Sequence, residues 1–269
     1  RTAAALMFVI GTGGLVLLGI VARAAAEITL VAALIAFILF VMCVAGLLAG
    51  SAAISSSVGR FLAPRIGGPD LLIASRRMIA APYTSSRATA AVLLAVIMGA
   101  AIQGTRSNFV LLDNNNFDTF YTDTFRLLDG VLIVAVVLAA ANLLVTNAEA
   151  IVERRRTLAA LTAGGTPKPV LARAVLMETL IPLVPSVILA ATAGLLAARS
   201  FFGTTVETFI YDDTGADLTS QQVTLDVPIP WERLAVLCGG TIAISIAITA
   251  LSLVLLGRST RPSELRAAA

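Results

Sequence analysis

The sequence predicts an all-α integral membrane protein, and three observations lead to that fold class. The chain of 269 residues is 58% hydrophobic and has a mean hydropathy of +0.94. Charged residues make up 13% of it, whereas soluble domains carry about 25%. The apolar residues gather in uncharged runs of about 20, the length at which a helix crosses the hydrocarbon of a bilayer. We therefore expect about six transmembrane helices.

The first two runs predict a transmembrane helical pair over residues 1–50. Residues 2–22 carry no charge, a short polar hinge follows over 23–27, and a second span covers 28–48. The run Gly11-Thr-Gly-Gly14 lies inside the first span with no strand before it. We interpret it as small residues for close helix packing and not as a nucleotide-binding loop.

Residues 51–87 form a polar linker with five arginines and several Pro and Gly residues. The spacing of Leu71, Leu72, Met78 and Ile79 predicts a short amphipathic helix at the membrane interface. The arginines are equally typical of an ordinary positive-inside anchor, and the two interpretations are compatible.

A third span is predicted over 88–102 and a fourth over 127–145, with a polar segment over 104–126 between them. The polar segment is too short and too weakly patterned for a folded domain. Asn142 lies within the fourth span. A single Asn in a membrane helix usually makes an interhelical hydrogen bond worth about 1 kcal/mol.

The fifth span, over 170–198, contains Pro182 and Pro185, which predict a kink or a passage from surface to membrane. Glu178 has two interpretations. At membrane depth a carboxylate would be a functional candidate. The favoured alternative is an interfacial ion pair with Arg173 or with the arginines at 154–156.

A second polar segment covers 199–230 and contains Asp212, Asp213 and Asp217. These acids lack the spacing of a calcium-binding loop, so we expect no metal site there. Residues 223–229 could form a strand, and Trp231 is a candidate interface anchor. The sixth span covers 234–256 and is followed by a basic tail.

The chain has no histidine, and both cysteines, Cys43 and Cys238, fall in apolar runs. Residues 165–168 lack the spacing of a phosphate-binding P-loop and its following Ser or Thr. We therefore expect no catalytic residue and no bound cofactor or metal on this chain.

Six spans place both termini on one side of the membrane. That side, with residues 50–87, 148–178 and 257–269, holds 14 of the 19 basic residues and 5 of the 16 acidic ones. The positive-inside rule assigns it to the cytoplasm. The other side is net acidic, which gives no indication of nucleic-acid binding.

Residues 149–169 hold the densest run of charge in the chain and lie between two apolar spans. Ile151, Val152, Leu158 and Leu161 recur at helical spacing, and the pair Gly164-Gly165 follows. This pattern predicts a short amphipathic helix on the membrane surface. The alternative is a solvated loop whose arginines only fix the topology.

The stretch Glu153-Arg-Arg-Arg-Thr-Leu-Ala-Ala-Leu-Thr-Ala-Gly-Gly-Thr166 resembles the cytoplasmic segment of FtsX-like ABC-transporter permeases, which usually have Leu-Gly-Ala-Thr near its end. In that family the segment is a coupling helix that docks on a separate ATPase subunit. The resemblance implies ATPase-coupling roles for eight residues: Glu153, Arg154, Arg155, Arg156, Leu158, Leu161, Gly164 and Gly165.

Two further stretches resemble the same family. Residues 75–94 are similar to the start of its first helix, and Pro262, Leu265 and Arg266 in the cytoplasmic tail occupy the places of its Pro, spacer and Leu-Arg. The resemblance implies a four-helix permease unit over 88–269. A helical pair before one such unit is similar to the second half of a long, two-unit permease. The abundance of Arg and Ala suggests a GC-rich bacterial genome.

The resemblance implies a permease subunit of an ABC transporter in the bacterial cell membrane. ATP and Mg would bind a partner ATPase dimer, whose hydrolysis would drive export or extraction of a lipid, peptide or hydrophobic drug. Expected partners also include membrane lipid and either a first permease half or a second copy. The alternatives are a mechanotransmitter that regulates an extracellular cell-wall hydrolase and an ATPase-independent channel or carrier.

Overall fold

The computed structural model describes residues 2–25, 30–63, 68–80, 82–112, 119–153, 167–211 and 220–259. Seven helices and two strands occupy these ranges in chain order. They are α1 (Thr2–Ala25), α2 (Leu30–Leu62), α3 (Pro69–Ala80), α4 (Pro82–Leu112), α5 (Thr119–Glu153), α7 (Lys168–Phe202), β1 (Thr205–Tyr211), β2 (Ser220–Asp226) and α8 (Trp231–Ser259).

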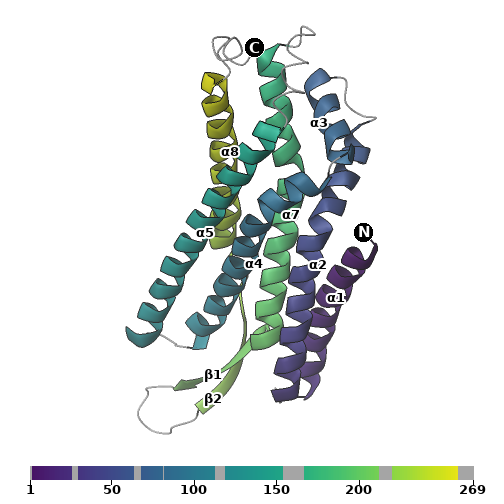
Figure 1. The fold of residues 1–269 in the computed structure, drawn as a ribbon. Coiled ribbons are helices and arrows are strands. Elements are labelled where there is room, and N and C mark those ends of the chain that lie inside the picture. The colour runs from purple at the N-terminus through teal and green to yellow at the C-terminus, as the bar shows by residue number, and fades with distance from the viewer. Residues whose placement is uncertain are drawn as a thin grey trace.

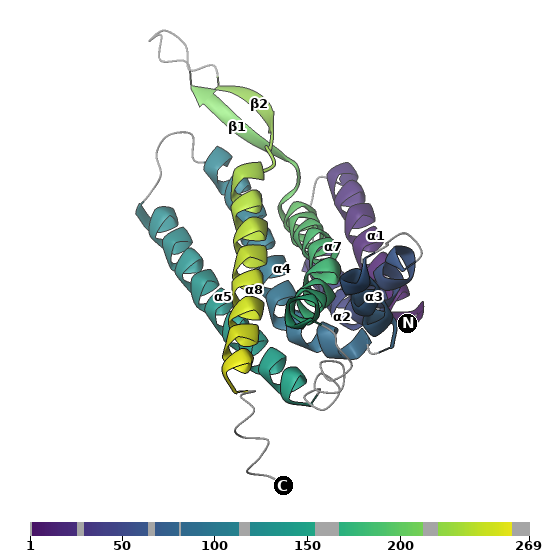
Figure 2. The ribbon, with the colours of Figure 1, turned by 90° about the horizontal axis from the view of Figure 1, so that it is seen from above.

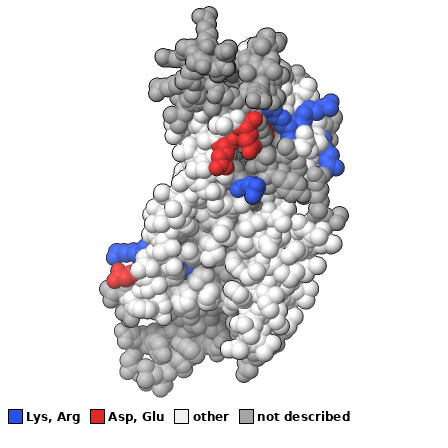
Figure 3. Space-filling model, in the orientation of Figure 1, with Lys and Arg blue, Asp and Glu red and all other residues white. Residues whose placement is uncertain are grey.

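Six of the described helices, all except α3, are long and apolar enough to cross a membrane, which confirms the predicted fold class. They run side by side, with the strands at one end of the bundle and α3 at the other (Figure 1). We call these the hairpin end and the α3 end. Figure 3 shows charged side chains near both ends of one face and an uncharged belt between them. The chain is therefore a multi-pass membrane protein.

The bundle has three layers, which Figure 2 shows from above. Helices α4 and α7 form the centre, α5 and α8 lie on one side, and α1, α2 and α3 lie on the other. The main buried cluster lies where these layers meet. Its fully buried large side chains come from four helices and are Leu47, Leu93, Ile97, Leu143 and Leu183.

Helices α4 and α7 make a very close contact because small residues line both surfaces. A Cβ atom on Gly194 would collide with the carbonyl oxygen of Ile97 and lie 2.9 Å from the Cβ of Ala100. A Cβ on Gly104 would lie 2.7 Å from the Cβ of Ala198. Such small-residue contacts let the backbones of membrane helices approach each other. We call this contact the α4–α7 seam.

Helices α1 and α2 form the predicted helical pair. Gly11 leaves no room for a Cβ against the backbone of Cys43, and Gly14 is equally tight against Leu39. These contacts show that Gly11 and Gly14 serve helix packing, whereas Gly13 has nothing within 4 Å of an added Cβ. The pair is joined to α7 through the hydroxyl of Ser200, which donates a hydrogen bond of 2.7 Å to the carbonyl of Leu15.

Helices α4 and α5 both extend well into the polar segment predicted over 104–126. Helix α4 continues to Leu112, and α5 begins at Thr119. Both helices therefore continue beyond the predicted spans of 88–102 and 127–145. In the structure Gln103 and Arg106 of α4 donate hydrogen bonds to Asp129 of α5, and the ring of Phe109 packs against Tyr121 and Phe125, so the two helix ends are joined.

The described part of the other polar segment is an antiparallel β-hairpin in which Thr205 pairs with Asp226 and Tyr211 with Ser220. The predicted strand over 223–229 therefore starts earlier and ends at Asp226. Pro228 has no N–H for a strand partner, and the last backbone bond at this end runs from Val227 N to Thr204 O at 2.8 Å. Gly203, with φ 82°, makes the turn out of α7.

Candidate functional site

The helices on either side of the predicted coupling segment end at the α3 end of the bundle. Helix α5 ends at Glu153, whose side chain is exposed, and α7 begins at Lys168 after the extended residue Pro167. Figure 1 places both ends beside the C-terminal end of α8. The segment 154–166 therefore connects two spans at the end opposite the β-hairpin.

Most of the predicted coupling and tail residues lie outside the described ranges. Of the coupling residues only Glu153 is described. The others are Arg154, Arg155, Arg156, Leu158, Leu161, Gly164 and Gly165, together with the tail residues Pro262, Leu265 and Arg266. Their roles stay predictions.

Glu178 lies in an ion pair with Arg77 of α3, a partner that the sequence did not predict, and the alternative partners Arg154, Arg155 and Arg156 lie outside the described ranges. An Oε2 atom of Glu178 lies 3.8 Å from Nη1 of Arg77, and the side chains are 6% and 19% exposed. Arg173 is on the same helix as Glu178 but is exposed. Five residues separate the two, which places them on different faces of α7 because only residues three or four apart are neighbours.

The Arg77–Glu178 pair fixes α3 between two spans. On one side Met78 and Ser75 of α3 are buried against α2, where a Cβ on Gly59 would lie 3.0 Å from the Cβ of Met78. On the other side Arg77 reaches α7. The amphipathic helix predicted around residues 71–79 is thus present, and it packs into the end of the bundle.

Helix α7 passes through Pro182 and Pro185 without a break. Pro182 has no N–H to donate to the carbonyl of Glu178, one turn earlier. The hydroxyl of Ser186 donates a bond of 2.7 Å to the carbonyl of Pro182. The helix is therefore continuous from the α3 end to Phe202 at the hairpin end.

A polar network joins α4, α5 and α8 near the hairpin end. Asp129 of α5 accepts bonds from Arg106 Nη1 at 3.0 Å and from Gln103 Nε2 at 3.4 Å. Gln103 Oε1 accepts a bond of 3.4 Å from Arg233 Nη1 of α8. We call these four residues the hairpin-end network.

Aromatic rings pack beside this network. The ring of Phe109 in α4 lies 5.6 Å from Tyr121, 6.1 Å from Phe125 and 5.6 Å from Phe202 of α7, measured between centroids. The guanidinium of Arg106 lies 5.4 Å from the centroid of Phe125. These contacts join the ends of three helices just inside the hairpin.

The hairpin is attached to α7 by a side chain as well as by the chain itself. Nη2 of Arg199 donates a bond of 3.1 Å to the carbonyl of Val227, the residue after β2. Both strands of the hairpin are thereby connected to the last turn of α7.

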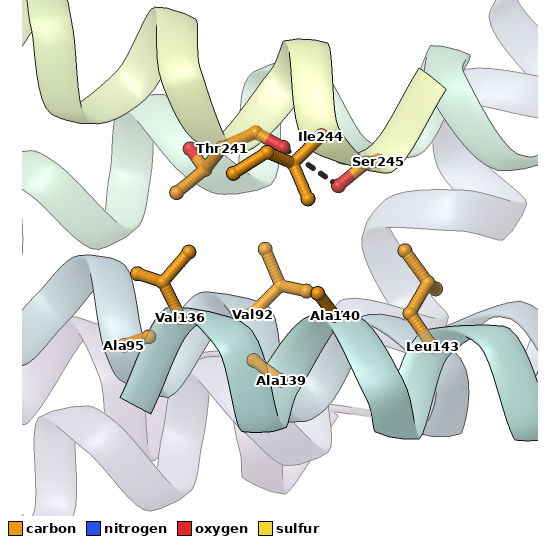
Figure 4. Close-up of a pocket in the computed structure, with 9 residues that line it drawn as sticks. All are labelled: Val92, Ala95, Val136, Ala139, Ala140, Leu143, Thr241, Ile244 and Ser245. Atoms are coloured by element: carbon orange, nitrogen blue, oxygen red, sulfur yellow. Dashed lines mark hydrogen bonds between the residues drawn. The ribbon is translucent and has the colours of Figure 1, made fainter. Parts of the chain in front are cut away.

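A small apolar recess lies between α4, α5 and α8, and its free space of about 10 Å³ is no more than one water molecule needs. Figure 4 shows Thr241, Ile244 and Ser245 of α8 facing α5 across it. The two hydroxyls donate to backbone carbonyls of their own helix. The complete lining is Val92, Ala95, Val136, Ala139, Ala140, Leu143, Thr241, Ile244 and Ser245.

The interhelical hydrogen bond expected of Asn142 is made by another residue. Asn147 Nδ2 donates a bond of 3.3 Å to Thr249 Oγ1 of α8, whereas Asn142 is exposed on the outer face of α5. At 3.6 residues per turn, five positions separate the faces of Asn142 and Asn147 by about 140°.

Within the described ranges, no group of three or more His, Cys, Asp or Glu side chains could hold a metal ion. The acids Asp212, Asp213 and Asp217 lie outside those ranges. The polar residues that the structure does bring together include the pair Arg77–Glu178 and the hairpin-end network.

Sequence reasoning missed the hairpin-end network, although one signal pointed to it. Arg106 and Asp129 have opposite charges; Arg106 stands just beyond the end of the third predicted span, and Asp129 stands at the start of the fourth. Consecutive antiparallel helices bring such residues together. No comparable signal identifies Arg233 as the third contributor.

Residues 130–260 match a family model described as FtsX-like permease C-terminal. The matched range includes most of α5, all of α7, the hairpin and α8. Neither a curated protein nor a solved structure matches the chain.

Proposed function

We propose that the chain couples ATP hydrolysis by a separate ABC ATPase to export or extraction of a hydrophobic or amphipathic substrate. The match of residues 130–260 to the FtsX-like permease family model supports this proposal. One observation carries this proposal: the segment 154–166, with its coupling motif, joins α5 to α7 at the end opposite the hairpin. A partner bound there would act directly on two spans.

The proposed orientation places the α3 end in the cytoplasm. The described basic side chains at that end are Arg60, Arg76, Arg77, Arg87 and Arg173. Three further arginines follow in the segment 154–166, and the tail adds more. A cytoplasmic excess of Arg follows the positive-inside rule, and it leaves the coupling motif and the tail accessible to a soluble ATPase.

In the proposed mechanism α7 transmits movement from the ATPase to the hairpin. The helix begins one residue after Pro167 and continues through Pro185 to Phe202. At its far end Arg199 bonds to Val227 next to β2. A displacement of the coupling segment would therefore reach the hairpin along one continuous helix.

The docking chemistry we propose follows from the residue types of the motif. Arg154, Arg155 and Arg156 would donate hydrogen bonds to carboxylates or carbonyls of the ATPase. Leu158 and Leu161, one helical turn apart, would fill an apolar groove on it. For ATP hydrolysis to change how the spans pack, the spans must have two alternative arrangements, and the ATPase must bind these with different affinities.

The described spans support a hydrophobic or amphipathic substrate better than an ion. The recess between α4, α5 and α8 is lined by apolar groups and by two hydroxyls whose protons are already donated to backbone carbonyls. Ions would need exposed charges or free oxygens along a path. This weakens the channel or carrier alternative.

A second permease half is part of the proposal, and the outer face of α5 is our candidate for its contact. Asn142 is exposed on that face in the middle of an apolar span. A polar side chain facing lipid is unfavourable, and such residues usually face another helix. A first permease half or a second copy would cover it.

Regulation of an extracellular cell-wall hydrolase is the second candidate, and one observation favours it. The β-hairpin at the end of α7 is an extramembrane element that the proposed transmission route reaches directly. A partner could pair with its strands, as extended segments often do at sheet edges. The hairpin is small, so we rank this function second.

The test is purification of the chain in mild detergent, followed by mass spectrometry and an ATPase assay of what copurifies. We expect a stoichiometric ATPase, and its loss when Leu158 and Leu161 are both replaced by Asp. The control is Ala160→Asp, which adds a charge on the opposite side of the predicted helix. Only the leucine variant should release the ATPase.

Two results would contradict the proposal. The first is a clean preparation with no ATPase and no ATP turnover, which would favour a channel or carrier. The second is equal release by Ala160→Asp and by the leucine variant, because binding would then depend on charge and not on the leucines. Thermal unfolding of both variants shows whether the spans remain folded.

A further inference from the structure

Gln103 is the residue through which α4 bonds to both α5 and α8. Its Nε2 atom donates a hydrogen bond of 3.4 Å to Asp129 of α5, and its Oε1 atom accepts one of 3.4 Å from Nη1 of Arg233 of α8. Gln103 is 8% exposed. A side-chain amide can donate and accept at the same time, so this one residue ties both helices to the centre of the bundle.

Helix α4 itself is held firmly by α7. Gly104, the neighbour of Gln103, belongs to the α4–α7 seam, where an added Cβ would lie 2.7 Å from the Cβ of Ala198. Helix α7 is in turn fixed to the α1–α2 pair through a second buried cluster and through the bond of 2.7 Å from Ser200 to the carbonyl of Leu15. We call α1, α2, α4 and α7 the central unit.

Helices α5 and α8 are bonded to each other at the opposite end of the bundle. Asn147 Nδ2 donates a bond of 3.3 Å to Thr249 Oγ1, and Thr249 is 1% exposed. Both residues lie within the apolar spans Phe120–Ala150 and Trp231–Ser252. Hydrocarbon offers no water to replace a lost hydrogen bond, so α5 and α8 should stay together. We call them the α5–α8 pair.

Below the network, the α5–α8 pair meets α4 through the ends of leucine side chains. A Cβ on Gly99 of α4 would lie 3.0 Å from a Cδ atom of Leu132 and 2.9 Å from one of Leu237. Side-chain ends can change rotamer, whereas the α4–α7 seam brings a glycine against a backbone carbonyl. The α5–α8 pair can therefore separate from α4 without a backbone collision.

The hairpin-end network lies where water can replace its bonds. The side chains of Arg106 and Asp129 are 27% and 39% exposed. Arg233 is exposed and lies two residues after Trp231, the exposed first residue of α8. Hydrogen bonds that are exchanged for bonds to water cost little to break. The network is thus a junction that can open and close reversibly.

We propose that the hairpin-end network is a latch. While Gln103 holds Asp129 and Arg233, the α5–α8 pair lies against α4, as in the structure. When these bonds break, α5 and α8 move away from α4 together at the hairpin end. Helix α5 leads into the segment 154–166 and α8 follows the hairpin, so the moving pair is attached to both extramembrane elements. The latch needs no ATPase; only its use in an ATP-driven cycle rests on the function proposed above.

The test measures distances between spin labels by double electron–electron resonance, on the full chain in lipid nanodiscs. Cys43 and Cys238 are replaced by Ala, and labelled cysteines are introduced in pairs at the exposed positions of Ile20 in α1, Leu127 in α5 and Val236 in α8. Two pairs report the distances from α1 to α5 and to α8. The third pair reports the distance between α5 and α8.

Two variants open the latch from different sides. Gln103→Glu keeps the acceptor for Arg233 and removes the donor to Asp129, whereas Arg233→Ala removes only the contact with α8. Because the α5–α8 pair moves as one unit, each variant should lengthen both distances to α1. We expect the longer distance to become about tenfold more populated, as the loss of one hydrogen bond would give. The distance between α5 and α8 should not change.

Two controls accompany these variants. Arg126→Gln removes an exposed charge at the same end of α5, where Arg126 bonds to Asp123 of its own helix at 3.3 Å, and it should change no distance. Labels at Ile20 and at the exposed Ile188 of α7 report on the central unit and should keep one distance throughout. Thermal unfolding identifies a variant that fails to fold. Arg233 is exposed, so Arg233→Ala decides if Gln103→Glu does not fold.

Four results would overturn the latch. Unchanged distances to α1 in the folded variants would show that the network does not hold the α5–α8 pair. A longer distance to α5 but not to α8 in Gln103→Glu would show that the two helices move independently. Equal lengthening in Arg126→Gln would indicate a general effect of lost charge. A changed distance between Ile20 and Ile188 would show that the central unit is not rigid.

Discussion

Arg77 and Glu178 connect two helices that are about one hundred residues apart in the chain, through an ion pair of 3.8 Å whose carboxylate is 6% exposed. The pair lies where the linker helix α3 meets the span that follows the coupling segment. It therefore ties the position of α3 to that of α7.

Removing one partner of this pair should destabilise the protein. Glu178→Gln leaves the guanidinium of Arg77 in a largely buried position, and the expected loss in free energy of unfolding is about 1–3 kcal/mol. Arg77→Met combined with Glu178→Leu should recover most of it, since no charge is then buried. Thermal unfolding in detergent measures both.

The exposed pair Arg126–Asp123 is the control, with side chains 76% and 67% exposed. Arg126→Gln should change the free energy of unfolding by less than about 0.5 kcal/mol. If Glu178→Gln has an equally small effect, the buried pair does not contribute to stability.

The α4–α7 seam should not tolerate one added methyl group. In Gly194→Ala the new Cβ meets the carbonyl of Ile97, so the helices must separate, at a cost of about 1–3 kcal/mol. Gly130→Ala on α5 has nothing within 4 Å of the added atom. It should stabilise the protein by up to about 1 kcal/mol through helix propensity. Opposite shifts in the unfolding temperature are expected, and a stable Gly194→Ala would refute the close contact.

Arg199 should control the stability of the hairpin. Arg199→Ala removes the bond to the carbonyl of Val227, and a hydrogen bond from a charged donor contributes about 1.5–3 kcal/mol. We expect the backbone amides of β1 and β2 to exchange hydrogen at least about tenfold faster. Amides in the middle of α7 should keep their exchange rates. Unchanged exchange in the hairpin would show that the bond does not hold it.

Asn142 should lie at a contact with another permease half. In a chain whose cysteines Cys43 and Cys238 are replaced by Ala, Asn142→Cys should form a crosslinked dimer in the membrane. Leu17→Cys, on the exposed face of α1, is the control and should crosslink much less. Equal crosslinking at both positions would indicate random collision.

The spans could be predicted from the sequence because their signal is local. A run of apolar residues is enough to identify each membrane helix, and all six were found. Helix ends were less predictable. The third predicted span ends at residue 102, whereas Gln103 and Arg106 lie within α4 and bond to Asp129 of the next helix.

The candidate site was predicted only in part, for a related reason. The motif around Glu153 is contiguous and can be read directly. The partner of Glu178 could not be predicted from sequence spacing, because Arg77 comes close to Glu178 only when α3 packs against α7. The same holds for Arg233 and Gln103, which are 130 residues apart.

The α4–α7 seam limits the ways in which this protein can change shape. Backbones in such close contact cannot slide or rotate against each other without a collision, so α4 and α7 have almost no independent degrees of freedom. Any rearrangement must instead be absorbed on either side of them, by α5 and α8 or by the α1–α2 pair.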